Sequence, residues 1–366
     1  MSTIYSRHGW LAALASHSAT VRALVASLSL PDLPYWDAAR KVALNLEAFN
    51  LANCDEHTLA LARGFDGLEA RGAPVAALGK LLTDLTARNT YGAFSELAAY
   101  IWFLDRGVPF DIQIPRSGSQ ILNPNGSDID GCLTIGLPVL FDVKAFGFQE
   151  YQAEQLRLKL SNDFPSDFVV VSGSLDVPVS VLSDLLGKGY SDLKVELGES
   201  RKASRSTIDF ELRPSARVQI SQRETSPYAL AEKNASYAFN YAKQFARNEP
   251  FILVFILHPW FNGSLTNNVG GYVDTFTRSF ARRTFMQFKN DPTATIGAVT
   301  RGEASRLLSG VAFIDAWLGK PRDAQSASEF RLFRNPNALH SISTLTRHGL
   351  AFDEPIADDG FEYDNY

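Results

Sequence analysis

Two neighbouring stretches, Ser127-Asp-Ile-Asp-Gly-Cys-Leu-Thr-Ile135 and Leu140-Phe-Asp-Val-Lys-Ala-Phe146, decide the fold that this sequence predicts. Both have the apolar content of buried strands, and Gly136-Leu-Pro138 between them suits a tight reversal. Side chains alternate between the two faces of a strand, so Asp142 and Lys144 point the same way. We therefore expect a hairpin that presents an acidic and a basic side chain together.

The first of these strands supplies further carboxylates. Asp128 and Asp130 share a face, and a hairpin would bring Asp130 beside Asp142. Two adjacent carboxylates repel each other unless a cation lies between them. Hard oxygen ligands suit Mg²⁺ or Mn²⁺. The pattern therefore predicts a divalent metal site, with Asp128 as the alternative to Asp130.

A third carboxylate comes from Glu96, the only charged residue in Phe94-Ser-Glu-Leu-Ala-Ala-Tyr-Ile-Trp-Phe-Leu104. This stretch has the length and apolar content of a buried helix. Burying a lone carboxylate is costly unless a partner or a metal neutralises it. We therefore expect Glu96 to face the same site.

A helix carrying an acid, followed by three strands with an Asp and then Asp-x-Lys, resembles the PD-(D/E)XK nuclease superfamily, which has the restriction-endonuclease-like fold. The resemblance covers about residues 90–146. It departs from the family pattern in one place, because Ile129 and not proline precedes Asp130. A second acid-x-lysine motif, Asp192-Leu-Lys194, lacks a preceding acidic hairpin, and we expect no chemistry there.

The resemblance implies a mechanism. Asp130, Asp142 and the Val143 carbonyl would hold one or two Mg²⁺ or Mn²⁺ ions, with Glu96 as a direct or water-mediated ligand. Lys144 would orient or help to deprotonate the attacking water and stabilise the transition state. The implied reaction is hydrolysis of a phosphodiester bond.

Periodicity predicts the organisation of the remaining chain. A helical region spans 1–88, a nuclease-like domain spans 89–318, and a C-terminal extension spans 319–366. A basic segment near 198–225 is inserted in the nuclease-like domain, and Gly198–Ser206 is expected to be a mobile loop. Predicted helices are Trp10–Leu28, Tyr35–Leu51, Leu59–Leu68, Pro74–Ala87, Glu150–Leu160 and Tyr228–Arg247, and further predicted strands are Phe110–Ile114, Asp167–Ser172, Thr207–Leu212, Arg217–Ser221, Phe251–Leu257 and Val311–Trp317.

Charge is unevenly distributed along the chain. The net charge is −5, but the tail from Asp353 to Tyr366 carries six acids and no Lys or Arg, so the remaining body is nearly neutral. Two segments within the body, Arg201–Arg223 and Thr277–Lys289, are basic. This predicts that they contact phosphate groups. The alternative for each segment is a solvated face or a flexible loop. The expected nucleic-acid-binding residues are Arg201, Lys202, Arg205, Arg278, Arg282 and Arg283.

Three other polar residues lie next to the predicted Phe251–Leu257 strand or on the helix before it. Lys243 and Gln244 could reach the site from the helix before the Phe251–Leu257 strand, with an exposed helix face as the alternative. His258 has no partner at metal-ligand spacing in the sequence, which favours a structural histidine.

Several classes of protein are excluded by composition. Two cysteines cannot build a disulfide scaffold or a cysteine zinc site, and no Gly-x₄-Gly-Lys-Ser/Thr loop is present. No apolar run reaches the roughly 20 residues of a membrane span, so we expect a cytoplasmic protein without a membrane partner.

We therefore expect an α/β protein with a restriction-endonuclease-like mixed β-sheet flanked by helices. The expected function is that of a Mg²⁺-dependent endonuclease acting on DNA in preference to RNA, in prokaryotic restriction or anti-phage defence. A second copy of the chain or a partner protein of a defence system would be its protein partner. The alternatives are a non-catalytic nucleic-acid-binding or assembly subunit that keeps the fold, and an RNA-cleaving effector.

Overall fold

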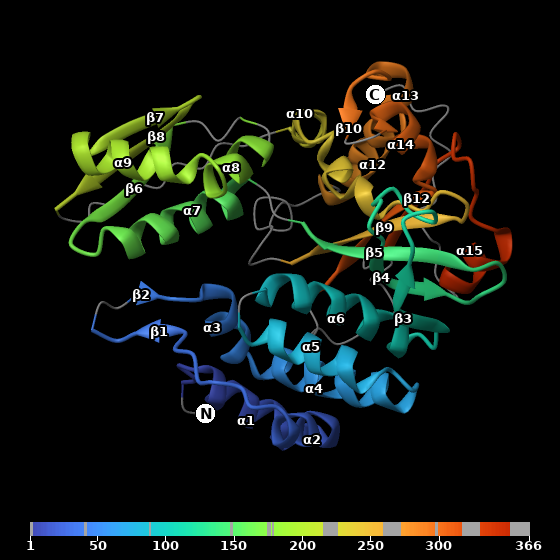
Figure 1. Ribbon diagram of the computed structural model, residues 1–366, viewed down its shortest axis with the longest axis horizontal. Helices are drawn as coiled ribbons and strands as arrows, with labels where there is room; N and C mark the ends of the chain where they lie inside the picture. The colour runs from blue at the N-terminus through green and yellow to red at the C-terminus, as the bar shows by residue number, and fades with distance from the viewer. Residues whose placement is uncertain are drawn as a thin grey trace.

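A mixed six-stranded sheet lies at the centre of the computed structural model, between two layers of helices (Figure 1). The structure describes residues 3–39, 42–87, 89–146, 149–173, 177, 179–214, 226–258, 272–296, 299–316 and 330–351. The strand order is β13-β12-β9-β5-β4-β3, in which β5, β9 and β12 are parallel and the remaining pairs antiparallel. These strands are β3 (Phe110–Arg116), β4 (Ser127–Leu133), β5 (Val139–Ala145), β9 (Phe251–Leu257), β12 (Gly310–Asp315) and β13 (Phe330–Arg334).

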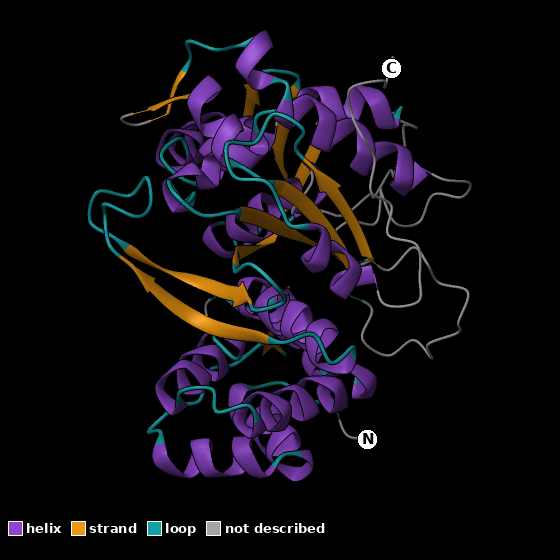
Figure 2. Cartoon of the chain, turned by 90° about the vertical axis from the view of Figure 1, so that its right-hand side faces the viewer, coloured by secondary structure: helices purple, strands orange, loops and turns teal. Residues whose placement is uncertain are grey.

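The predicted α/β class with a mixed sheet flanked by helices is confirmed. Every residue of β9 is buried, as its continuous apolar sequence predicts for a parallel strand covered on both faces. Figure 2 shows the strands between the two helical layers. None of the described helices combines the length and apolar character needed to cross a bilayer.

The N-terminal helices cover one face of the sheet through α6 (Thr90–Asp105). Helix α6 contacts β5 and β9, while α4 and α5 pack against its outer side. Phe65, Leu82, Phe103 and Phe141 belong to one continuous core, so this helical region shares its interior with the sheet. The other elements of this region are α1 (Arg7–His17), α2 (Ala19–Ser27), β1 (Trp36–Asp37), β2 (Val42–Ala43), α3 (Leu46–Ala52), α4 (Asp55–Ala70) and α5 (Val75–Leu85).

A second core covers the opposite face and is rich in phenylalanine. The ring of Phe146 lies 5.0 Å from that of Phe255, and Phe280 and Phe313 pack against both. The elements described after the insert, other than the strands of the main sheet, are α10 (Pro227–Lys233), the 3₁₀ helix η1 (Tyr237–Gln244), α12 (Tyr272–Phe285), α13 (Gln287–Asn290), β10 (Thr295–Ile296), β11 (Val299–Thr300), α14 (Arg301–Leu307) and α15 (Thr344–Ala351).

Between β5 and β9 the chain builds a smaller unit, here called the insert (residues 149–214). Its three-stranded antiparallel sheet has the order β6-β8-β7, and its own core contains Leu156, Leu193 and Phe210. In Figure 1 the insert lies at the left, beyond the end of β5. Its elements are α7 (Gln149–Asp163), β6 (Phe168–Gly173), α8 (Val179–Leu186), α9 (Tyr190–Ser200), β7 (Lys202–Arg205) and β8 (Ile208–Arg213).

Two predicted N-terminal helices are corrected by the structure. The helix expected over Trp10–Leu28 is divided at Ser18, whose hydroxyl accepts the Val21 amide and begins α2. Over Tyr35–Leu51 the structure has the β1–β2 hairpin followed by α3, which begins only after Asn45 caps it by accepting the Ala48 amide.

Two predictions for the second half of the chain are also corrected. The predicted Tyr228–Arg247 helix is α10 followed by η1, and Gly198–Ser206 is the end of α9 and strand β7, not a loop. Arg201, with a φ of 60°, closes α9 and lets the chain reverse into β7. The expected strand at Arg217–Ser221 and the acidic tail lie outside the described residues.

Candidate active site

Strand β5 places Asp142 and Lys144 on one face, as predicted from alternation. Lys144 Nζ lies 2.7 Å from Asp142 Oδ2; the Asp142 side chain is fully buried, and that of Lys144 is 16% exposed. Phe141 and Val143 pack into the core shared with α6, so Asp142 and Lys144 face the opposite, phenylalanine-rich layer. A buried acid–lysine pair thus lies in the middle of the sheet.

Asp130 lies where β4 and β5 part. The register of this strand pair ends at Gly131 and Phe141, and Asp130 is the next residue towards Asp142. Asp130 Oδ2 accepts the Val143 amide at 2.7 Å. In a strand the N–H and C=O of one residue point to the same side, so the Val143 carbonyl also faces this gap. Asp128 is exposed, so the structure brings Asp130 and not Asp128 beside Asp142.

Gly131 allows the two strands to approach. A Cβ at this position would lie 2.2 Å from Phe141 Cζ and 2.6 Å from the Asp111 carbonyl oxygen. No side chain fits at such distances, so the glycine of the Asp-Gly pair is required by the Phe141 ring. This packing fixes the end of the ladder at which Asp130 lies.

The charges at this site are strongly coupled. Burial raises the pKa of Asp142 well above its ordinary value; the charge of Asp130 adds to this rise and that of Lys144 opposes it. Burial disfavours the charge on Lys144, but Asp142 and Asp130 outweigh it and raise the pKa of its ammonium group. No amine, amide or hydroxyl group of the described residues donates to Asp142 Oδ1. Among the described residues, Lys144 is therefore the one cation that pairs with Asp142.

Glu96 approaches from the other face of the sheet, on α6. Burial raises its pKa to about 8, and the charge of Asp130 acts in the same direction, while that of Lys144 lowers it. Glu96 is thus electrostatically linked to Asp130 and Lys144. Among the described residues, however, no three His, Cys, Asp or Glu side chains are arranged to hold a metal ion. The structure brings together Asp130, Asp142 and Lys144, with Glu96 as a more distant neighbour.

Tyr241 and Tyr237, on η1, lie near the site and were not predicted from the sequence. The Lys144 ammonium lies 5.3 Å from the ring centroid of Tyr241, within the range of a cation–π contact. The Tyr241 hydroxyl donates to that of Tyr237 at 3.1 Å. Of the two residues considered on this segment, Lys243 is exposed and Gln244 only partly buried.

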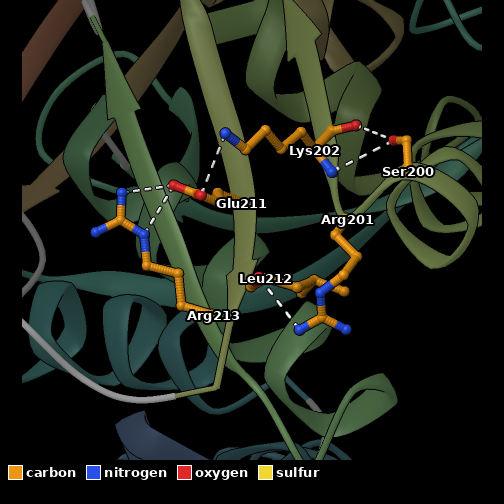
Figure 3. A network of polar contacts seen from close by, with 6 residues as sticks. All are labelled: Ser200, Arg201, Lys202, Glu211, Leu212 and Arg213. Carbon is orange, nitrogen blue, oxygen red and sulfur yellow. Dashed lines mark hydrogen bonds and ion pairs between the residues drawn. The ribbon is translucent and has the colours of Figure 1, made fainter.

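The expected nucleic-acid-binding residues lie elsewhere, in the insert and on α12. In the insert, each forms an ion pair: Arg201 with Asp167 at 2.5 Å, Lys202 with Glu211 at 3.5 Å and Arg205 with Glu196 at 2.7 Å. Figure 3 shows Glu211 between Lys202 and Arg213. On α12, which also carries Arg278 and Arg282, Arg283 lies 3.6 Å from Glu232. Phosphate contact by these six residues stays a prediction.

His258 has a partner that the sequence did not reveal. Its Nε2 lies 2.9 Å from Nε2 of His57 on α4, and both rings are buried against Phe94. Burial lowers the pKa of His57 to about 4. The two rings thus join the N-terminal helices to the end of β9, as expected of a structural histidine.

Comparisons with known proteins identify no relative of this chain. The sequence matches no family model and no curated protein, and the structure matches no solved structure. The function is therefore argued from the site itself.

Proposed function

We propose that this protein is a metal-dependent nuclease of the restriction-endonuclease-like kind, which hydrolyses phosphodiester bonds in DNA. The observation that carries the proposal is the buried group of Asp130, Asp142 and Lys144 at the point where β4 and β5 diverge. The acid-bearing helix α6 and the strands β3, β4 and β5 follow one another in the order on which the sequence resemblance is based, and β9 lies parallel to β5. A role in prokaryotic restriction or anti-phage defence belongs to the same proposal.

The donor groups of this site fit a divalent cation. Asp142 Oδ1 is buried and accepts no amine, amide or hydroxyl hydrogen bond from the described residues, and the pKa of Asp142 is raised by burial and by Asp130, so a cation here would relieve an existing cost. Asp130, Asp142 and the Val143 carbonyl would hold Mg²⁺ or Mn²⁺, with Glu96 acting through water. Such an ion lowers the pKa of a coordinated water and offsets charge on the phosphate.

Lys144 supplies a positive charge beside the carboxylates. Its raised pKa keeps the ammonium protonated at neutral pH, so it donates hydrogen bonds and does not remove a proton. An ammonium fixed in a buried site stabilises negative charge that develops on a phosphate oxygen. The Tyr241 ring restricts where the Lys144 head group can move. We therefore assign Lys144 to phosphate and transition-state stabilisation.

A second candidate is a non-catalytic nucleic-acid-binding or assembly subunit. It is favoured by the closed Lys144–Asp142 pair and by the absence, among the described residues, of three carboxylates arranged around a metal. The same fold would then keep the ion pair as part of its core.

The decisive experiment incubates supercoiled DNA, linear DNA, single-stranded DNA and RNA with the full chain in Mg²⁺, Mn²⁺ or EDTA. Asp142→Ala and Lys144→Ala should each lower metal-dependent cleavage by about 1,000-fold. Asp192→Ala and Lys194→Ala are the matched controls, because they alter the second acid-x-lysine motif, which lies on the helix α9. Both controls should cleave like the wild type.

The outcomes separate the candidates. Equal cleavage by the wild type, Asp142→Ala and Lys144→Ala rejects the site. Binding of nucleic acid without cleavage of any substrate supports the assembly subunit. Cleavage confined to RNA replaces DNA with RNA as the substrate and keeps the site.

A further inference from the structure

Gln113 has an unusual backbone for a residue inside a strand. Its φ is 51°, in the left-handed region that non-glycine residues seldom adopt. The other described non-glycine residues with positive φ are Arg201, at the end of α9, and Ser206, in the turn between β7 and β8. Left-handed residues are ordinary at helix ends and turns, but within a strand such a conformation persists only where the surroundings enforce it.

The position of Gln113 coincides with that of Asp130 across the sheet. The β3–β4 register pairs Ile112 with Gly131 and Ile114 with Ile129, so Gln113 is opposite Asp130. This is the one pair missing from the ladder between Phe110 and Arg116. The left-handed residue therefore interrupts pairing at the proposed metal ligand.

Around this interruption, the side chains of both strands change the face of the sheet to which they point. In β3, Phe110 and Ile112 pack into the core shared with α6, whereas Ile114 packs against the opposite core. In β4, Ile129 and Cys132 both pack into that opposite core, three residues apart, although regular alternation requires an even spacing. Both strands thus change phase around the Gln113–Asp130 pair.

Tyr100 on α6 occupies the place that the ladder leaves open. Its hydroxyl donates to the Asp130 carbonyl oxygen at 2.8 Å, and its ring is fully buried. The Gln113 side chain also hydrogen-bonds to Tyr100. The Asp130 peptide is therefore held from the helix instead of from β3.

We propose that Gln113 is a positioning residue for Asp130: its left-handed backbone opens the β3–β4 ladder, so that Tyr100 fixes the Asp130 peptide and the carboxylate turns to the Val143 amide. The catalytic meaning of this placement rests on the proposed nuclease function. The placement itself does not, because the bond from Val143 to Asp130 can be observed without metal or substrate.

The test compares Gln113→Gly with Gln113→Val in the full chain labelled with ¹⁵N-valine. Glycine adopts positive φ freely, whereas a β-branched residue resists it. The Val143 amide resonance reports the bond to Asp130, and Asp130→Ala supplies the resonance position without that bond. We expect Gln113→Gly to keep the wild-type position and Gln113→Val to shift to the Asp130→Ala position. Mn²⁺ binding by calorimetry should weaken about 10-fold in Gln113→Val only.

A matched control and a milder variant keep the test decisive. Ser206→Val places the same strain in the β7–β8 turn and should leave the Val143 resonance and Mn²⁺ binding unchanged. If Gln113→Val does not fold, Tyr100→Phe removes one hydroxyl and should still move the Val143 resonance. Tyr35→Phe, which removes a buried hydroxyl bonded to the Thr86 carbonyl, should not.

An unshifted Val143 resonance in Gln113→Val, or in Tyr100→Phe where the first variant does not fold, would overturn the proposal. So would a Gln113→Gly variant whose Val143 resonance resembles that of Asp130→Ala. Absence of Mn²⁺ binding by the wild type counts against the proposed function alone, because the Val143 resonance still decides the role of Gln113.

Discussion

The main sheet and the insert contain the same ionic pairing in opposite environments. In the main sheet, Lys144 binds Asp142 with side chains 16% and 0% exposed; in the insert, Lys202 binds Glu211 with side chains 74% and 27% exposed. Burial raises the pKa of Asp142, whereas hydrogen bonds from Arg213 lower that of Glu211 (Figure 3). Burial therefore disfavours the charge on the Asp142 carboxylate, whereas hydrogen bonding favours the charge on that of Glu211.

The two ion pairs differ in their energetic cost. An exposed pair forms at little cost and contributes little stability. Burying a carboxylate beside a second carboxylate lowers the free energy of unfolding, and one lysine offsets only part of this loss. The main sheet keeps that cost, which agrees with the cation site proposed above.

The largest expected effect on stability comes from Lys144→Ala, which leaves Asp142 buried without its cation. The free energy of unfolding should fall by about 3 kcal/mol in metal-free buffer at pH 7, measured by urea denaturation. Lys202→Ala is the matched change in the insert and should move the midpoint of thermal unfolding by less than about 2 °C. Equal losses of stability in the two variants would show that the buried pair matters no more to stability than the exposed pair.

A smaller effect is expected from Glu96→Gln and depends on pH. A glutamate whose folded pKa is raised to about 8 from its ordinary 4.5 makes the wild type lose stability as pH rises through this window. The slope of this loss is at most about 1.4 kcal/mol per pH unit. Glu96→Gln should remove this loss in urea unfolding between pH 5 and pH 8. An unchanged slope would show that Glu96 is not held in this environment.

Asp142→Asn should raise stability by about 1 kcal/mol at pH 7 without metal, because it removes the repulsion from Asp130 but also weakens the Lys144 pair. The raised pKa of Asp142 means that the wild type loses stability as pH rises above 3.8, so the gain should vanish in acid. Added Mn²⁺ should stabilise the wild type and not the variant, as measured by thermal unfolding. A variant less stable than the wild type at pH 7 would contradict this account.

Much of this site was predictable because it depends on local patterns. The apolar stretches predicted α6, β4 and β5, and alternation placed Asp142 and Lys144 on one face. The choice between Asp128 and Asp130 was not local, since it depends on where the β4–β5 ladder ends and on the Val143 amide. Only the tertiary structure reveals these two facts.

Other features were hidden by distance along the chain or by a break in periodicity. His57 and His258 are 201 residues apart in sequence, and no pattern links them. Tyr241 lies on η1, which follows a helix that ends at Lys233, so a continuous Tyr228–Arg247 helix misplaces its face. The basic character of 201–213 was correctly read, but the nearby acids that pair with it come from α9, β8 and the turn before β6.

The smallest effect is expected in the insert. Glu211→Gln leaves Lys202 and Arg213 without their carboxylate, so one net positive charge is added to β7 and β8. If β7 and β8 contact phosphate, the affinity for DNA should rise. The slope of the logarithm of affinity against the logarithm of salt concentration should then become more negative by about one. If these strands do not contact phosphate, affinity at each salt concentration should equal that of the wild type, and the cations of the insert are structural. Filter binding across a salt series distinguishes the two results.

The chain leaves the main sheet for the insert shortly after Lys144 and returns before β9, the parallel neighbour of β5. Because the apolar residues of the insert pack with one another, its surface can be rewritten or its loops lengthened while the pairing of β5 with β9 stays in register. Sequence changes can therefore accumulate next to β5 without altering β5 itself. Grafting a foreign domain at this junction is the corresponding opportunity for engineering.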